Sequence, residues 1–217
     1  MNQLPLSPRH LYYGGTFDPV HNGHLKPSIA LAETLEAERL SFMPCFIPPH
    51  KEPARVTSHH RLQMLHLALE AEQANTRVKL DIEEFELNRQ APSYTVTTLE
   101  HFTERLTTTE SAGLGLVIGM DSLLSLTKWH RWQDILALSH IYVMARPGYV
   151  LIENELPAEL EPYLQDRIKL VPTPELDISS THIRHQLLTG QSVEADSLPE
   201  SVLDYIEQHQ LYRAPRL

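Results

Sequence analysis

The sequence of 217 residues is short of cysteine, of basic side chains and of long apolar runs. Its single cysteine, Cys45, cannot form a disulfide within the chain, which suits a reducing compartment. The longest apolar run is the seven residues 114–120, whereas a membrane-spanning helix needs about 20. Eighteen Lys and Arg residues stand against 28 Asp and Glu, a net charge of −10. Proteins that bind nucleic acid usually carry a basic surface, so this acidity argues against that function class.

The amino terminus also lacks a basic segment followed by an apolar stretch, which argues against a secretory signal. We therefore expect a soluble cytoplasmic protein that binds neither nucleic acid nor membranes. Hydrophobic residues make up 41% of the chain and charged residues 21%, which is typical of a folded protein. Without repeats or long linkers, residues 1–217 are expected to form one domain. A helical portion at about 178–212 is expected to pack on the same core.

Short apolar runs alternate with helical patterns along the chain. The predicted strands are Leu11–Tyr13, Leu40–Ile47, Arg77–Glu83, Leu114–Ile118, Ile141–Ala145 and Ile168–Val171. The predicted helices are Gly23–Glu38, a helix from the N-cap Ser58 to about Gln73, Ser93–Leu106, a short helix ending at Leu138, Thr181–Leu188 and Pro199–His209. This alternation predicts an α/β protein with a doubly wound parallel sheet and helices on both faces. Ligands bind such sheets beyond the carboxyl ends of the strands.

A glycine-rich turn, GGTFDPVHNGH at residues 14–24, follows the first predicted strand. Paired glycines allow a tight turn and a close approach of the backbone to a ligand. The turn leads into a helix, whose first N–H groups and dipole favour an anion. His21 and His24 can face the same anion and donate hydrogen bonds to it. The pattern indicates a phosphate site that carries two imidazoles.

Other interpretations of this turn stay open. The glycine pair is also consistent with a turn that binds nothing. The two histidines can also be read as metal ligands, but zinc usually takes three or four ligands, which His50, His59 and His60 would have to complete. The segment lacks both the G-x-G-x-x-G fingerprint of dinucleotide sites and the Gly-Lys-Ser/Thr of a Walker loop.

A second candidate turn, DISSTHIR at residues 177–184, lies near the carboxyl terminus. Its hydroxyl side chains are typical of a plain helix N-cap. The alternative is a second phosphate cradle, in which Ser180, Thr181 and Arg184 surround the start of a helix.

The two turns together resemble the signatures of nucleotidyltransferases, which transfer a nucleoside monophosphate from a nucleoside triphosphate. Residues 14–24 resemble their G-T-F-D-P-x-H-x-G-H signature, and residues 178–184 resemble I-S-S-T-x-I-R. Segments 47–51, 91–95, 119–122 and 128–130 are similar to bacterial nicotinate-nucleotide adenylyltransferases, and the resemblance runs from about residue 11 to 212. It implies a Rossmann-like core and the transfer of AMP from ATP to nicotinate mononucleotide, which gives deamido-NAD and pyrophosphate.

The resemblance also implies roles for particular residues. It gives His24, His21 and Arg184 to the chemistry. It gives ten residues to ATP: Gly14, Gly15, Thr16, Phe17, His21, His24, Lys51, Ser180, Thr181 and Arg184. Mg²⁺ is expected to arrive with ATP, and because it usually keeps several waters we name no protein ligand for it. Asp18 is expected to orient the turn rather than to bind metal.

For nicotinate mononucleotide the resemblance implies Thr95, Asp121 and Trp129. The indole of Trp129 suits the flat, positively charged pyridinium ring, although Trp129 and Trp132 can also be read as core residues. The chain departs from the family where Cys45 replaces a frequent Asn and where His130 replaces a frequent aromatic residue. Both positions belong to the mononucleotide side, so the preference for nicotinate over nicotinamide stays open.

Three rival functions remain at this point. The first is transfer to another phosphorylated acceptor, such as phosphopantetheine or an alcohol phosphate. The second is a nucleotide sensor without activity, and the third is a histidine-rich metal-binding protein. The oligomeric state is not predicted.

Overall fold

The computed structural model describes residues 9–47, 53–105, 114–145, 148 and 156–213. At its centre lie six parallel strands in the order β3-β2-β1-β4-β5-β6. The strands are β1 His10–Gly15, β2 Arg39–Pro44, β3 Lys79–Ile82, β4 Leu114–Gly119, β5 His140–Ala145 and β6 Ile168–Pro172. From β1, the sheet is extended in one direction by β2 and β3 and in the opposite direction by β4, β5 and β6. This reversal of strand order between β1 and β4 leaves a crevice at the carboxyl ends of these two strands. The predicted doubly wound sheet is confirmed.

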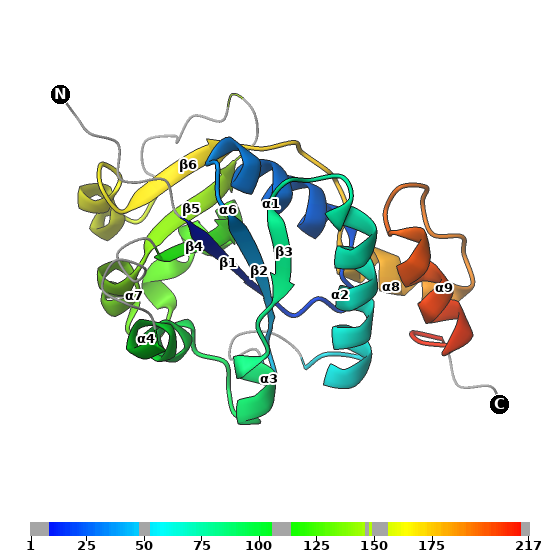
Figure 1. Ribbon diagram of the computed structural model, residues 1–217. Coiled ribbons are helices and arrows are strands. Elements are labelled where there is room, and N and C mark those ends of the chain that lie inside the picture. The colour runs from blue at the N-terminus through cyan, green and yellow to red at the C-terminus, as the bar shows by residue number, and fades with distance from the viewer. Residues whose placement is uncertain (1–8, 48–52, 106–113, 146–147, 149–155, 214–217) are drawn as a thin grey trace.

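Helices cover both faces of the sheet, with α1 and α2 on one face and α4 and α7 on the other (Figure 1). The α-helices are α1 Asn22–Thr34, α2 Ser58–Gln73, α3 Phe85–Arg89, α4 Thr95–Arg105, α6 Met120–Leu124, α7 Trp132–Leu138, α8 Ser180–Thr189 and α9 Glu200–Gln208. Two 3₁₀ helices are η1 Leu126–Lys128 and η2 Ala158–Tyr163. Within the described ranges, none of the helices has the length and apolarity needed to span a bilayer.

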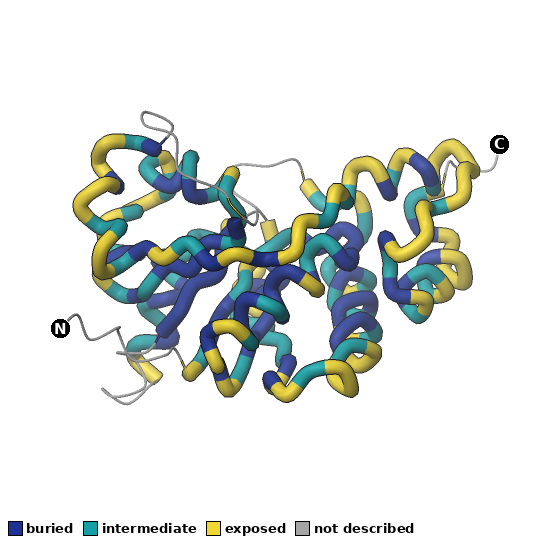
Figure 2. The backbone as a smooth tube through the Cα atoms, turned by 90° about the horizontal axis from the view of Figure 1, so that it is seen from above, coloured by how far each residue is buried: buried dark blue, intermediate teal, exposed yellow. Residues whose placement is uncertain are grey.

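Alternating residues of each strand enter two separate cores, because successive side chains of a strand point to opposite faces. Leu11, Leu40 and Phe42 pack with α1, α2 and α9. Tyr12 and Met43 point the other way and pack with α4 and α7. Figure 2 shows the strands as the buried centre of the molecule, with exposed residues on the outer helices and loops. A parallel sheet that is covered on both faces in this way holds its strand ends in fixed relative positions.

The structure corrects several predicted boundaries. Helix α2 ends at Gln73 as predicted, but its N-cap is Thr57, whose side chain accepts from the N–H of His60, and not Ser58. Strand β2 stops at Pro44 instead of Ile47. After Pro44 the chain leaves the ladder, and the N–H of Phe46 donates to Ser93 Oγ at 3.1 Å. Helix α1 ends at Thr34 rather than at residue 38, because Glu36 adopts a left-handed φ of 54°. The short helices α3 and η2 were not predicted, since so few residues give no periodic signal.

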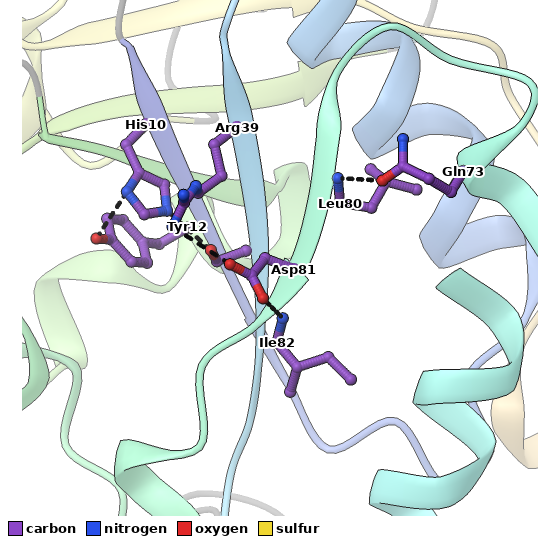
Figure 3. A network of polar contacts seen from close by, with 8 residues as sticks. His10, Tyr12, Arg39, Gln73, Leu80, Asp81 and Ile82 are labelled. Carbon is purple, nitrogen blue, oxygen red and sulfur yellow. Dashed lines mark hydrogen bonds and ion pairs between the residues drawn. The ribbon is translucent and has the colours of Figure 1, made fainter. Parts of the chain in front are cut away.

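A polar network crosses β1, β2 and β3 (Figure 3). The ring of His10 lies between two hydroxyl groups, with Ser41 Oγ 2.8 Å from Nε2 and the Tyr12 hydroxyl 3.0 Å from Nδ1. On the edge strand β3, Asp81 pairs with Arg39 at 3.3 Å. Burial, and then the charge of Arg39, lower the pKa of His10 from 6.5 to about 4, although Asp81 opposes the shift. The neutral ring satisfies both hydroxyls in either tautomer, because each hydroxyl can donate or accept.

We expect this histidine to make folding stability depend on pH. Between pH 6.5 and pH 4, His10 is mostly protonated in the unfolded chain and mostly neutral in the folded chain. Stability should therefore be lost as the pH falls through this window and be constant above it. Urea unfolding at pH 7.5 and pH 5.0 should show a smaller acid-induced loss for His10→Gln than for the unaltered chain. Equal losses in the two proteins would contradict the assignment; His21, which also titrates near pH 4, is common to both.

Candidate active site

The glycine-rich turn after β1 is shaped by Phe17, which folds back over the end of the strand. Phe17 has a left-handed φ of 50° and is only 1% exposed. A side chain at Gly15 would place its Cβ 2.8 Å from the Phe17 ring, so only glycine permits this fold-back. Phe17 then meets the ring of His24 edge to face, with 5.2 Å between the centroids. The turn therefore presents the histidines against a rigid aromatic support.

His21 and His24 stack on each other at the start of α1, with their ring centroids 3.7 Å apart. His21 occupies the N-cap position, and its own side chain makes no capping hydrogen bond. Burial lowers the pKa of His21 from 6.5 to about 4, so its ring is neutral at pH 7. Its buried Nδ1 finds no hydrogen-bond partner among the described residues. The N–H of Asn22 donates to the carbonyl of Ser197 at 2.9 Å, and that of His24 donates to the carbonyl of His21 at 2.8 Å. The positive end of the helix dipole with an imidazole beside it is nevertheless suited to an anion.

The second turn lies directly against the first. Ser180 Oγ donates to the carbonyl of Pro19 at 3.0 Å, and Arg184 Nη1 donates to the carbonyl of Asp18 at 2.7 Å. A Cβ at Gly23 would lie 3.2 Å from Cβ of Ile178, so the start of α1 and the residues before α8 are in close contact. The N-cap interpretation holds for Ser179, whose side chain accepts from the N–H of His182. The two predicted phosphate sites thus form one surface.

Asp18 sits at the junction of these segments and is 5% exposed. Its Oδ1 accepts a hydrogen bond of 2.8 Å from the Tyr212 hydroxyl, and its Oδ2 accepts one of 2.7 Å from the N–H of Arg55. Both carboxylate oxygens are therefore engaged by groups of the chain. This geometry favours the expected role of Asp18 in orienting the turn.

Arg61 links the segments that follow the two neighbouring strands β1 and β2. It lies on α2, and its guanidinium donates to the carbonyls of Thr16 and Cys45, both at 2.7 Å. In the sequence, Arg61 ends a segment rich in basic residues, 50–61, which does not reveal that its side chain is 1% exposed. The amphipathic period of α2 gives the only signal, because it puts Arg61 on the face that carries Leu65.

A hollow of about 210 Å³ adjoins the histidine turn between β5 and β6. Gly23, Met144, Ala145 and Thr173 contribute to its wall. Gly23 belongs to the first signature and Ala145 ends a predicted strand, but Met144 and Thr173 were not predicted as site residues. A larger hollow of about 380 Å³ lies at the opposite, amino-terminal ends of β5 and β6. Parallel α/β sheets bind ligands at their carboxyl ends, so the smaller hollow belongs to the candidate site.

The residues expected to bind nicotinate mononucleotide lie at the neighbouring strand ends. Asp121 is exposed in the first turn of α6, directly after β4, and its charge adds to burial in raising the pKa of Tyr13 on β1. Thr95 begins α4, and the residues before α4 are linked to the segment after β2 by the hydrogen bond from the N–H of Ser93 to the carbonyl of Ile47. Trp129 is partly buried against the second core. The alternative that it only packs therefore stays open.

The two positions that depart from the family have different surroundings. Cys45 is buried, with its Sγ 3.7 Å from Thr16 Oγ1, and burial raises the pKa of the thiol. His130 is exposed, and its ring lies 4.9 Å from that of Tyr94. Lys51 and His50 lie outside the described residues. The described part of the chain holds no group of three or more His, Cys, Asp or Glu residues arranged to bind a metal ion.

Comparisons with known proteins identify the family. Residues 12–186 match the model of the cytidylyltransferase-like domains. A protein of Pectobacterium atrosepticum named probable nicotinate-nucleotide adenylyltransferase is 41% identical, over 93% of this chain and 97% of the relative. A protein of Salmonella gallinarum with the same name is also 41% identical, over 93% and 97%.

Solved structures agree in fold. The nicotinic acid mononucleotide adenylyltransferase of Plasmodium falciparum, complexed with APC, has a TM-score of 0.70 at 17% identity, over 94% of this chain and 96% of that one. The same enzyme complexed with NaAD has a TM-score of 0.68. The sequence similarity over nearly the full length, the matching domain model and the shared fold together show that this chain belongs to the nicotinate-nucleotide adenylyltransferase family of nucleotidyltransferases.

Proposed function

We propose that this protein transfers the adenylyl group of ATP to nicotinate mononucleotide and releases pyrophosphate, a step of NAD biosynthesis. One observation carries the proposal beyond family membership: Arg184 and Ser180 hydrogen-bond the same turn that leads into the stacked pair His21 and His24. Donors from both signatures thereby converge on one surface, as a triphosphate requires. The curated relatives bear the name of this activity.

The chemistry needs positioning rather than a protein nucleophile. The 5′-phosphate of the mononucleotide is an anion at pH 7, and it attacks the α-phosphorus in line while pyrophosphate leaves. His24 donates to the oxygen on which charge builds during the attack, and His21 supports it as a neutral donor. Ser180, Thr181 and Arg184 hold the β- and γ-phosphates from the other side. Gly14, Gly15, Thr16 and Phe17 bring the backbone close to the nucleotide, and Lys51 is expected to add a further cation.

Mg²⁺ is proposed as the ion that accompanies ATP. Both carboxylate oxygens of Asp18 accept hydrogen bonds, from the Tyr212 hydroxyl and from the N–H of Arg55. The residues of the turn therefore fit an ion that is held mainly by phosphate oxygens and water. Asp121 is the exposed carboxylate at the adjacent strand end. The ion supplies neutralisation of the polyphosphate charge when it is bound.

The proposed activity is tested by pyrophosphate release from ATP and Mg²⁺, with nicotinate mononucleotide and nicotinamide mononucleotide compared at matched concentrations. We expect the nicotinate form to be used in strong preference. Equal use would reject the acceptor preference and point to the substitutions at Cys45 and His130. An absence of turnover with either acceptor would contradict the proposal and favour another phosphorylated acceptor or a nucleotide sensor.

His24→Ala should lower kcat by about 10²–10³, because the variant loses one donor to the charge of the transition state. Binding of ATP, followed by calorimetry, should weaken far less. His66→Ala is the matched control, since His66 is an exposed histidine on α2. Turnover of His24→Ala within threefold of the unaltered enzyme would remove His24 from the chemistry.

Trp129→Ala should raise KM for nicotinate mononucleotide and leave KM for ATP nearly unchanged, because the stacking partner of the pyridinium ring is lost. Trp132→Ala provides the comparison, since Trp132 packs edge to face on Tyr163 at 6.1 Å. Steady-state kinetics on both variants separate the two interpretations of Trp129. If the two variants raise the same KM values by the same factors, Trp129 is a packing residue.

A further inference from the structure

Tyr212 lies far from the first signature in sequence, yet its hydroxyl contacts Asp18 of that signature. The residue follows α9, and its hydroxyl donates to Asp18 Oδ1 across a separation of 194 residues. The backbone places it there through two left-handed residues, Gln210 with φ 51° and Tyr212 with φ 60°. Residues other than glycine rarely adopt this conformation, so contacts with neighbouring residues must stabilise it. Leu211 between them is buried in the first core.

Asp18 passes this contact on to the groups that handle ATP. Its carboxylate is held by Tyr212 and by the N–H of Arg55, while its own carbonyl accepts from Arg184 Nη1. The next carbonyl, that of Pro19, accepts from Ser180 Oγ. A shift of Asp18 therefore displaces the acceptors of Arg184 and Ser180, and also the backbone that leads to His21.

We propose that Tyr212 is a positioning residue for adenylyl transfer: its hydroxyl holds Asp18, and Asp18 sets the placement of Arg184 and of the histidine turn. The inference rests on the proposed roles of Arg184 and the histidines. Tyr212 itself touches no substrate. It acts because a buried carboxylate that loses one of its two donors must find another, and the turn moves to do so.

The chemistry of the pair suits a permanent contact. Burial, then the charge of Asp18 and the hydrogen bond to it, raise the pKa of Tyr212, whereas Arg184 and Arg61 lower it. The phenol therefore remains protonated and donating at every pH at which the enzyme would be assayed. The contact is a fixed part of the site and not a pH switch.

The test is Tyr212→Phe, which removes only the hydroxyl oxygen. We expect kcat to fall about tenfold and KM for ATP to rise severalfold, since misplacement of catalytic groups by a fraction of an ångström has effects of this order. KM for nicotinate mononucleotide should stay within twofold, because the residues proposed for that substrate lie in the first turns of α6 and α4 and directly after η1. A kcat within twofold of the unaltered enzyme would overturn the proposal.

Tyr205→Phe is the matched control. It makes the same chemical change on α9, where the Tyr205 hydroxyl lies 3.0 Å from His60 Nδ1 on α2, away from Asp18. Each substitution removes one hydrogen bond, and Tyr212→Phe should lower the thermal midpoint more, because its partner is a buried carboxylate. Only Tyr212→Phe should lower kcat. Equal kcat values for the two variants would reduce Tyr212 to a purely structural role.

A double-mutant cycle tests whether the effect passes through Asp18. In an Asp18→Asn background, where one carboxylate oxygen is already replaced, Tyr212→Phe should lower kcat by less than twofold. An undiminished tenfold loss there would contradict transmission through Asp18. His24→Ala, measured in parallel, reports on the proposed site itself. If His24→Ala retains activity, the site assignment fails. If His24→Ala loses activity and Tyr212→Phe retains it, only the positioning role of Tyr212 fails.

Discussion

The buried guanidinium of Arg61 is the interaction on which the geometry of the site depends. It donates to the last carbonyls of two neighbouring strand ends, at Thr16 and Cys45, and so fixes the turn after β1 relative to β2. Burying a charge is costly unless hydrogen bonds replace its water. Among the described residues no carboxylate forms an ion pair with Arg61, so carbonyl dipoles provide this compensation. A hydrophobic residue of similar size could fill the space but could not hold the two carbonyls.

The electrostatics of the site resolve the conflict between an acidic protein and an anionic substrate. With a net charge of −10, the protein as a whole repels a triphosphate. The candidate site relies instead on local groups: the positive dipole end of α1, the neutral ring of His21 and the guanidinium of Arg184. The nearby carboxylate of Asp18 accepts hydrogen bonds from two chain donors, which offsets part of its charge. Affinity for phosphate here is a matter of oriented N–H groups more than of net charge.

Much of this could be predicted from the sequence, and the exceptions share a cause. The strands, their parallel arrangement and helix α2 follow from periodic patterns that each segment carries by itself. The meeting of the two signatures was predictable because both lie at strand ends of one sheet. The burial of Arg61, the contact of Tyr212 with Asp18 and the wall formed by Met144 and Thr173 depend on how separate elements dock. No local pattern encodes such contacts, and Phe17 in a left-handed conformation is likewise decided by its packing.

The convergence of both ends of the chain on Asp18 has a consequence for how the enzyme comes into being. The turn leaves the ribosome well before Tyr212, which follows Asp18 by 194 residues. Pairings between such distant residues form late in folding, because the loop between them must first be closed. A nascent chain can therefore assemble its early strands while its nucleotide site is still unfinished. Synthesis and maturation of the site are thereby coupled, and a prematurely terminated chain would lack the hydroxyl that secures the turn.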